Sequence, residues 1–126
     1  MVTEGQAKQF AEEWIGAWNQ RDIQEIIRHY ADAIEFWSPR IVSHYGIEAG
    51  VIRDKSVLVR YFIHGLDTQP KLKFTLLNVL RGVDSICIYY RRENGTEVAE
   101  VVVLNETMEA TMVRVHYFER QHVPKP

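Results

Sequence analysis

Apolar residues in the first part of the chain recur at the spacing of an amphipathic helix. Thr3 followed by Gln6 matches a capping box, and Phe10, Trp14 and Trp18 then recur at every fourth position. A residue and its fourth neighbour lie on the same face of a helix. The pattern therefore predicts a first helix with one apolar, aromatic face, which we expect to pack on a sheet.

A short helix and a short strand are predicted next. Asp22, with Glu25 three residues later, matches a second helix N-terminus. The apolar positions that continue this helix are Ile23, Ile26, Ile27 and Tyr30. Ile34 and Phe36 then follow the alternation of a strand, and the proline after Ser38 restrains that residue to extended conformations. We expect this strand to end at Ser38.

Residues 40–53 contain two glycines and no clear period, which predicts a loop with an extended piece at residues 41–44. Asp54 then matches the N-terminus of a third helix, which ends before Pro70. Its apolar positions are Val57, Leu58, Tyr61, Phe62 and Leu66.

Runs of β-branched and aromatic residues dominate the rest of the chain. They cover residues 72–80, 85–92, 96–105 and 111–119, with turn residues between them. Helices followed by strands predict an α+β fold, with three N-terminal helices packed on a strongly curved, mostly antiparallel sheet. The length of 126 residues fits one domain over 1–126. Residues 121–126, which include two prolines, are expected to be loose.

The dipeptide Asn94-Gly95 predicts how two of these strands pair. Asn-Gly is typical of a two-residue type I′ hairpin, which places Glu93 opposite Thr96 and, further along, Tyr89 opposite Glu100. For the next strand pair, we expect the register that keeps valines together on one face. That register makes Glu100 and His116 neighbours on adjacent strands.

The predicted register divides the sheet into two faces. One face carries Ile86, Ile88, Tyr90, Val101, Val103, Val113 and Val115. The other carries Cys87, Tyr89, Glu100, Val102, Leu104, Met112, Arg114, His116 and Phe118. Two interpretations of this second face stay open: a half-solvated surface, or the wall of a pocket in which a carboxylate and an imidazole converge.

Composition narrows the classes of partner. The chain has 15 Lys and Arg against 17 Asp and Glu, a formal charge of -2, and no basic stripe, so nucleic acid is not expected as a partner. No apolar run is long enough to span a bilayer, so no membrane insertion is expected. The single cysteine, Cys87, has no partner for an internal disulfide, and no leader is recognisable before the first helix. We therefore expect a reducing, cytoplasmic location.

No fingerprint of a bound metal or cofactor is found in the sequence. The five histidines include no His-x-His or His-Glu-x-x-His spacing. A phosphate-binding loop, a dinucleotide fingerprint and a nucleophile elbow are also missing. We expect neither a metal nor a cofactor.

The order of these elements resembles the nuclear transport factor 2-like superfamily, and more closely its SnoaL-like branch of polyketide cyclase and ketosteroid isomerase relatives. The resemblance covers roughly residues 3–119. Its short motifs are the turn Asn19–Asp22, the segment His29–Asp32, Ser38–Pro39, and Asp54–Lys55 ahead of Tyr61–Phe62. The resemblance implies a cone-shaped fold in which a curved sheet wraps three helices around a deep pocket, often as a homodimer through the sheet. Because one scaffold serves many functions, it implies no particular activity.

The catalytic groups of the ketosteroid isomerases in this superfamily are not matched here. Those enzymes use a tyrosine on the first helix, an aspartate base at the end of the first strand and a protonated aspartate on a late strand. Here Trp14 stands at the position of the tyrosine, Ser38 at that of the base, and a residue near Leu104 at that of the protonated aspartate. Isomerase chemistry of that kind is therefore not expected. The same comparison places Cys87 and Glu100 on the inward face, which favours the pocket interpretation.

Two functions remain open from the sequence. The first is an enzyme site for a small, largely apolar molecule, of cyclase, isomerase or dehydratase type, with Glu100 and His116 as general acid and base. The second is a non-catalytic ligand-binding or dimerising scaffold domain. The residues expected to contact the molecule are Trp14, Trp18, Tyr30, Ser38, Tyr61, Phe62, Cys87, Tyr89, Val102 and Phe118. A homodimer is expected through the face that carries Ile86, Ile88, Val101, Val103, Val113 and Val115.

Overall fold

The computed structural model describes residues 1–119, so the segment 121–126 that is predicted to be loose lies outside the described residues. Within that range the helices are α1 (Glu4–Asn19), α2 (Ile23–Ile27), α3 (Pro39–Tyr45) and α4 (Lys55–Thr68). The strands are β1 (Tyr30–Trp37), β2 (Val51–Ile52), β3 (Phe74–Arg81), β4 (Ser85–Arg92), β5 (Glu97–Leu104) and β6 (Ala110–Phe118).

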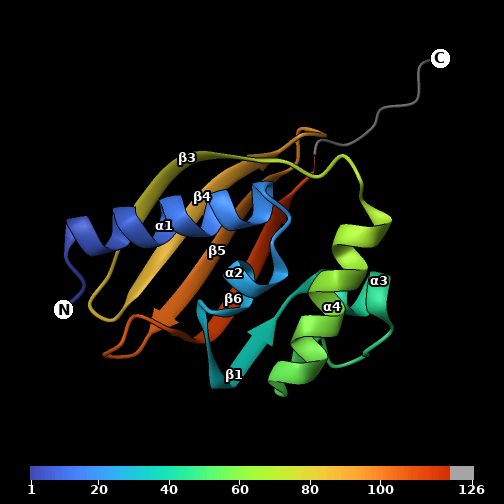
Figure 1. Ribbon diagram of the computed structural model, residues 1–126, viewed down its shortest axis with the longest axis horizontal. Coiled ribbons are helices and arrows are strands. Elements are labelled where there is room, and N and C mark those ends of the chain that lie inside the picture. Colours follow the sequence, from blue (N-terminus) through green and yellow to red (C-terminus); the bar gives the residue numbers. More distant parts are fainter. Residues whose placement is uncertain (120–126) are drawn as a thin grey trace.

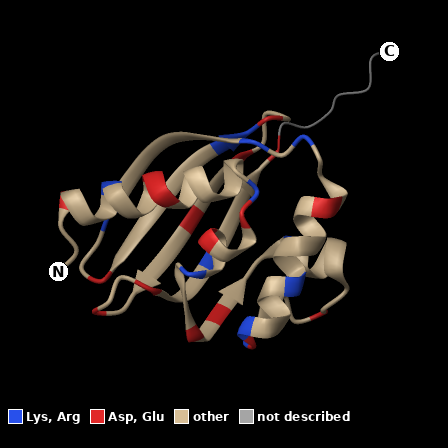
Figure 2. Cartoon of the chain, in the orientation of Figure 1, with Lys and Arg blue, Asp and Glu red and all other residues tan. Residues whose placement is uncertain are grey.

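The described strands form one curved sheet in the order β2-β1-β6-β5-β4-β3, and helices α1, α2 and α4 lie over one side of it (Figure 1). Neighbouring strands are antiparallel except β1 and β6, which are parallel. Acidic and basic residues lie mainly on the helices, the loops and the strand ends (Figure 2). The predicted α+β fold, with helices packed on a curved and mostly antiparallel sheet, is confirmed.

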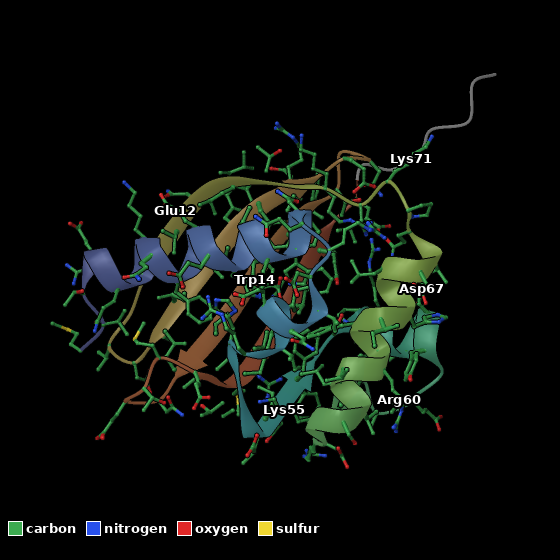
Figure 3. All side chains as sticks on the ribbon, viewed as in Figure 1. Glu12, Trp14, Lys55, Arg60, Asp67 and Lys71 are labelled. Atoms are coloured by element: carbon green, nitrogen blue, oxygen red, sulfur yellow. The ribbon has the colours of Figure 1, made fainter. Side chains whose placement is uncertain are left out.

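Helix α1 begins as its sequence predicts. Thr3 Oγ1 accepts a hydrogen bond from Gln6 N (3.1 Å), and Gln6 Oε1 accepts one from Thr3 N (3.0 Å). Trp14 and Trp18 are both buried. Trp14 lies between α1 and the sheet, whereas Glu12 points away from it (Figure 3). The aromatic face of this helix therefore forms part of the core.

Residues 40–53 differ from the prediction, because α3 and β2 replace the expected loop and its extended piece. Ser38 Oγ caps α3 by accepting a hydrogen bond from Arg40 N (3.2 Å). Pro39 occupies the first turn, where a helix needs no N–H donor. Gly46 ends the helix with φ of 76°, in the left-handed region. The proline that stops β1 thus also starts a helix, one too short for its periodicity to be recognised.

The turn between β4 and β5 is longer than predicted. Arg92 N donates to Thr96 O (2.8 Å), and Gly95 N donates to Arg92 O (2.9 Å), so three residues form the loop rather than two. Gly95 has φ of 87°, but Asn94 does not adopt the positive φ that a type I′ turn also requires there. Thr96 therefore lies opposite Arg92 instead of Glu93.

The pairing of β5 shifts by one residue as a result. Glu100 lies opposite Ile88 on β4 and opposite Val115 on β6. The predicted pairings of Glu100 with Tyr89 and with His116 are therefore wrong. Because successive strand residues point to opposite faces, this shift moves every β5 side chain to the other face relative to its neighbours.

The helix-facing side of the sheet, called the inner face below, differs from both predicted faces. It carries the buried residues Ile86, Ile88, Tyr90, Val98, Glu100, Val102, Val113 and Val115. Val101 and Val103 point to the opposite, outer face. The predicted dimer face is therefore divided, because its residues Ile86, Ile88, Val113 and Val115 are buried within one chain. No helix within residues 1–119 is long and apolar enough to cross a membrane.

Candidate functional site

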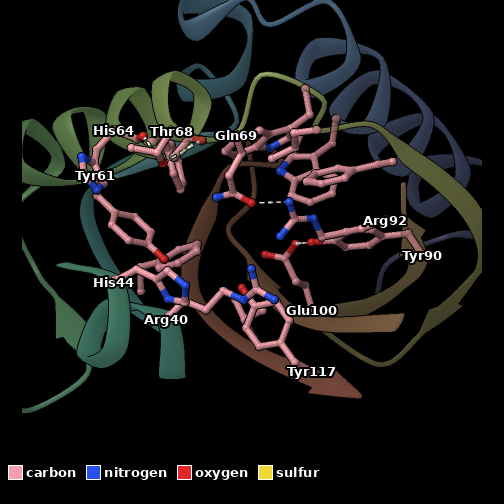
Figure 4. Close-up of a pocket in the computed structure, with 18 of the residues that line it drawn as sticks. Arg40, His44, Tyr61, His64, Thr68, Gln69, Tyr90, Arg92, Glu100 and Tyr117 are labelled. Atoms are coloured by element: carbon pink, nitrogen blue, oxygen red, sulfur yellow. Dashed lines mark hydrogen bonds between the residues drawn. The ribbon is translucent and has the colours of Figure 1, made fainter. Parts of the chain in front are cut away.

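A cavity of about 90 Å³ lies between the helices and the inner face of the sheet (Figure 4). Its aromatic lining includes Trp14, Trp18, Tyr30, Phe36, Phe62 and Phe74. Its polar lining includes Arg40, Gln69, Tyr90, Arg92, Glu100 and Tyr117. Cavities that are mostly apolar with a few placed polar groups are typical of small-molecule sites.

Glu100 projects from β5 into this cavity (Figure 4) and is only 3% exposed. Tyr90 Oη donates a hydrogen bond to Glu100 Oε2 (2.6 Å). Burial raises the pKa of Glu100 to about 7, although the hydrogen bond from Tyr90 opposes the rise. Both the acid and the carboxylate forms are therefore populated near neutral pH, as proton transfer in both directions requires.

Tyr30, at the start of β1, places a second hydroxyl at the cavity. Trp14 Nε1 donates a hydrogen bond to Tyr30 Oη (2.9 Å). Burial and the nearby Glu100 charge raise the pKa of Tyr30 well above its ordinary value, so this phenol keeps its proton. A hydroxyl that accepts one hydrogen bond is polarised and donates another more strongly. Tyr30 can therefore donate to an oxygen atom of a bound molecule.

Two arginines line the cavity in different environments. Arg40, from α3, lies 4.4 Å above the centre of the Tyr117 ring and pairs with Glu119 (2.8 Å). Arg92, at the end of β4, is buried and donates a hydrogen bond from Nη2 to Gln69 Oε1. Burial raises the pKa of the Tyr117 phenol far above its ordinary value, so the Tyr117 hydroxyl stays neutral beside Arg40.

The structure brings together only part of the predicted site. The predicted residues that line the cavity are Trp14, Trp18, Tyr30, Tyr61, Phe62 and Glu100. Ser38 is buried with its Oγ 3.4 Å from Tyr117 Oη, behind the lining, and Val102 is buried in the core of the inner face.

The other predicted site residues lie on the outer face, so their predicted place at the pocket is wrong. His116 is exposed and lies opposite Ala99, which removes the predicted pair of Glu100 with His116. Cys87 and Tyr89 point outward between Ile86, Ile88 and Tyr90, and Phe118 is 61% exposed. The pairing of β5 differs from the prediction by one residue against β4 and by one residue against β6, which explains these errors, since it exchanges the faces of β5 relative to both neighbours.

Sequence reasoning missed several polar residues of the cavity. Tyr90 and Arg92 are in phase with the apolar positions Ile86 and Ile88, so a buried arginine was recognisable from strand alternation alone. Arg40 could not be recognised, because it lies on α3, which was predicted as a loop.

The donors of this cavity do not form a metal site. Within the described part of the chain, no group of three or more His, Cys, Asp or Glu side chains could hold a metal ion. The cavity instead offers hydroxyl, guanidinium, imidazole and amide groups around one carboxyl group. These groups suit an organic molecule that carries oxygen atoms.

Comparison with solved structures places this fold in a family. A SnoaL-like protein of unknown function from Burkholderia thailandensis E264 is 36% identical to the chain, with a TM-score of 0.90 over 94% of this chain and 98% of that one. The chain belongs to the SnoaL-like family. No protein-family model and no curated protein matches this SnoaL-like chain.

More distant structures share the fold of this SnoaL-like protein. An NTF2-like protein of unknown function from Burkholderia pseudomallei K96243 has a TM-score of 0.72 at 16% identity, covering 90% of this chain and 91% of that one. TerC, crystallised with polyporic acid, has a TM-score of 0.73 at 12% identity, covering 90% of this chain and 92% of that one. The predicted membership of the SnoaL-like branch is confirmed, and the fold is that of NTF2-like structures.

Proposed function

We propose that this SnoaL-like protein binds a small, largely aromatic molecule in the cavity and transfers protons on it through Glu100. The observation that carries the proposal is a carboxyl group with a pKa of about 7, buried in an aromatic cavity. Co-crystallisation of TerC with polyporic acid supports small-molecule binding by this fold.

The arrangement suits removal of a proton from carbon beside a carbonyl group. Glu100 Oε2 accepts a hydrogen bond from Tyr90, and within residues 1–119 no hydrogen bond reaches Oε1. Oε1 of the carboxylate would take the proton, and the electron pair of the C–H bond would pass to the carbonyl oxygen. Tyr30 would stabilise that oxygen by donating its hydroxyl proton in a hydrogen bond. Return of the proton to another carbon would complete an isomerisation. If Glu100 instead gave the proton to a β-hydroxyl group, the C–O bond would break, water would leave and a dehydration would result. If the enolate carbon attacked a second carbonyl of the same molecule, the new C–C bond would close a ring, and the proton would go to the oxygen of that carbonyl.

This proposal predicts exchange of carbon-bound protons with solvent. With 2-tetralone as the probe in deuterated buffer, wild-type protein should speed deuterium uptake beside the carbonyl, as followed by NMR. Glu100→Gln should lower that rate by about a hundredfold or more, since a positioned proton transfer contributes that much. Glu97→Gln is the matched control, because Glu97 is on the same strand but faces outward and should keep the wild-type rate.

The result also separates catalysis from simple binding. If 2-tetralone binds but exchanges equally fast with wild-type protein and the Glu100→Gln variant, Glu100 transfers no proton and the protein is a binding module. The binding function is the alternative because His116, the predicted acid–base partner of Glu100, lies on the outer face and not in the cavity.

We also propose that the protein forms a homodimer through the outer face of the sheet. Leu80 lies opposite Cys87, and Cys87 lies opposite Val101, so an apolar stripe crosses three neighbouring strands. Leu80 is 53% exposed and Val101 is 37% exposed. Contiguous exposed apolar surface of this kind is typical of interfaces.

A further inference from the structure

Arg92 is a buried cation whose hydrogen-bonding capacity is only partly used. Its side chain is 6% exposed. Within residues 1–119, its Nη2 donates to Gln69 Oε1, while the buried Nε has no hydrogen-bond partner. A guanidinium carries five N–H donors, so most of them are not matched by acceptors of the described residues.

The nearest carboxylate compensates this charge only in part. Glu93 Oε1 lies 3.6 Å from Arg92 Nε, beyond a hydrogen bond, and it also accepts a hydrogen bond from Lys73 N (3.0 Å). Glu100 lines the same cavity but forms no ion pair with Arg92 among the described contacts, and its raised pKa leaves it partly neutral. Burying an arginine without a close anionic partner is costly.

The other arginine of the cavity shows the contrast. Arg40 has a carboxylate of Glu119 at 2.8 Å and lies over the Tyr117 ring. The positive charge of Arg40 is therefore neutralised by a carboxylate of the same chain. Of these two guanidinium groups, Arg92 is the one that has no carboxylate within hydrogen-bond distance among the described residues.

A second unpartnered donor lies in the same lining. Trp18 is 7% exposed, and its Nε1 forms no hydrogen bond of good geometry within residues 1–119, although the Tyr30 hydroxyl lies near it. Buried polar atoms without partners are rare in native proteins and call for an explanation. Two such donors, one on α1 and one on β4, line a cavity with aromatic rings, which matches a ligand that carries acceptor oxygens on an aromatic body.

We propose that the cavity selects a small aromatic carboxylate, whose carboxylate group binds Arg92 while its ring packs on the tryptophans of α1. The planar fork of a guanidinium matches the two oxygens of a carboxylate. The site of the ligand is that of the proposed function, so this inference rests on it and adds the chemical class of the ligand. A cavity of about 90 Å³ favours a small ligand of one or two rings.

Benzoate and benzamide test this inference, because they have nearly the same shape but differ in charge. Binding is measured by calorimetry and by quenching of tryptophan fluorescence in wild-type protein. We expect benzoate to bind about tenfold or more tightly than benzamide, the difference expected for a hydrogen bond to a charged group. This comparison needs no variant and so does not depend on how substitution affects folding.

Substitution then assigns the selectivity to one residue. Arg92→Met should abolish the preference for benzoate and leave benzamide binding within about twofold, a margin well below the tenfold unit of affinity. Arg91→Met is the matched control, because Arg91 is the exposed neighbour on the same strand, carries the same charge and points to the outer face. That variant should keep the wild-type preference.

Each outcome decides a different claim. Equal or tighter binding of benzamide by wild-type protein would overturn the anionic ligand and leave the proposed function intact. Preference for benzoate that survives Arg92→Met would also overturn the role of Arg92. Failure of both probes to bind at millimolar concentration would overturn this inference together with aromatic ligand binding itself.

Discussion

Burial of the Glu100 carboxylate lowers the stability of the folded chain. Its pKa in the folded chain is about 7 against an ordinary value of 4.5, because burial disfavours the charged form. The folded state therefore binds more protons than the unfolded state between these values, and stability falls as pH rises through that range. Above pH 7 the full cost is roughly 3 kcal/mol.

This cost predicts a pH-dependent gain in stability for Glu100→Gln. The titratable and charged groups that share the surroundings of Glu100 are Tyr30 on β1, Tyr61 on α4, Cys87 and Tyr90 on β4, Tyr117 on β6, and the cavity residues Arg40, Arg92, His44 and His64. The pKa values of the four tyrosines and of Cys87 are raised, so these five groups stay neutral between about pH 5 and pH 8.

Urea unfolding measures the effect. Relative to wild type, the Glu100→Gln variant should gain little at about pH 5 and up to roughly 3 kcal/mol at about pH 8. Glu97→Gln should follow the wild-type curve. Parallel pH curves for wild-type protein and Glu100→Gln would show that Glu100 has an ordinary pKa in the folded chain.

At the residue scale, the sequence predicted that Glu100 and the tryptophans of α1 meet at one site, but not what surrounds them. The aromatic spacing of Trp14 and Trp18 fixes their helix face, and both line the cavity. The partner of Glu100 depended on strand register, which local sequence specifies weakly. Tyr90 therefore replaces His116 as its hydrogen-bonding neighbour.

At the scale of elements, one turn decides which side chains meet. Helix caps at Thr3, Asp22 and Asp54 were predictable because each is a local contact between a side chain and the next turn. The dipeptide Asn94-Gly95 is compatible with a hairpin loop of two residues or of three residues. The turn that forms is the one that buries Val98, Glu100 and Val102 on the inner face, and no local pattern indicates which β5 residues are buried.

Gly95→Ala tests the importance of this turn. Gly95 has φ of 87° and no atom within 4 Å of an added Cβ, so the penalty comes from the backbone alone. We expect a loss of about 1–2 kcal/mol in the free energy of unfolding, the cost of a left-handed conformation.

Gly16→Ala is the matched control for that substitution. Gly16 lies within α1, also has no atom within 4 Å of an added Cβ, and should become more stable by about 0.5–1 kcal/mol because alanine favours helix. Chemical denaturation of both variants gives the comparison. A stabilising effect at Gly95 would mean that the turn does not hold this register.

At the scale of the whole molecule, the proposed homodimer depends on the outer face of the sheet. Val101→Glu should convert the proposed dimer to a monomer, since a buried carboxylate in an apolar interface is costly. Light scattering at tens of micromolar, roughly the range of modest interfaces, measures the change. Val83→Glu is the control, because Val83 is 72% exposed in the turn between β3 and β4. A monomeric wild-type protein at this concentration would contradict the dimer.

The parallel pairing of β1 with β6 has a consequence for how the chain is made. Tyr30 pairs with Ala110, and Phe36 pairs with Val113, so an early strand is completed by a late one. A ribosome releases the chain from its N-terminus, and contacts between distant segments form slowly. Until residues 110–118 emerge, β1 has only the short β2 beside it and the core under α4 stays open. Folding of this domain therefore awaits synthesis of β6, and until then the chain exposes a strand edge that chaperones can recognise.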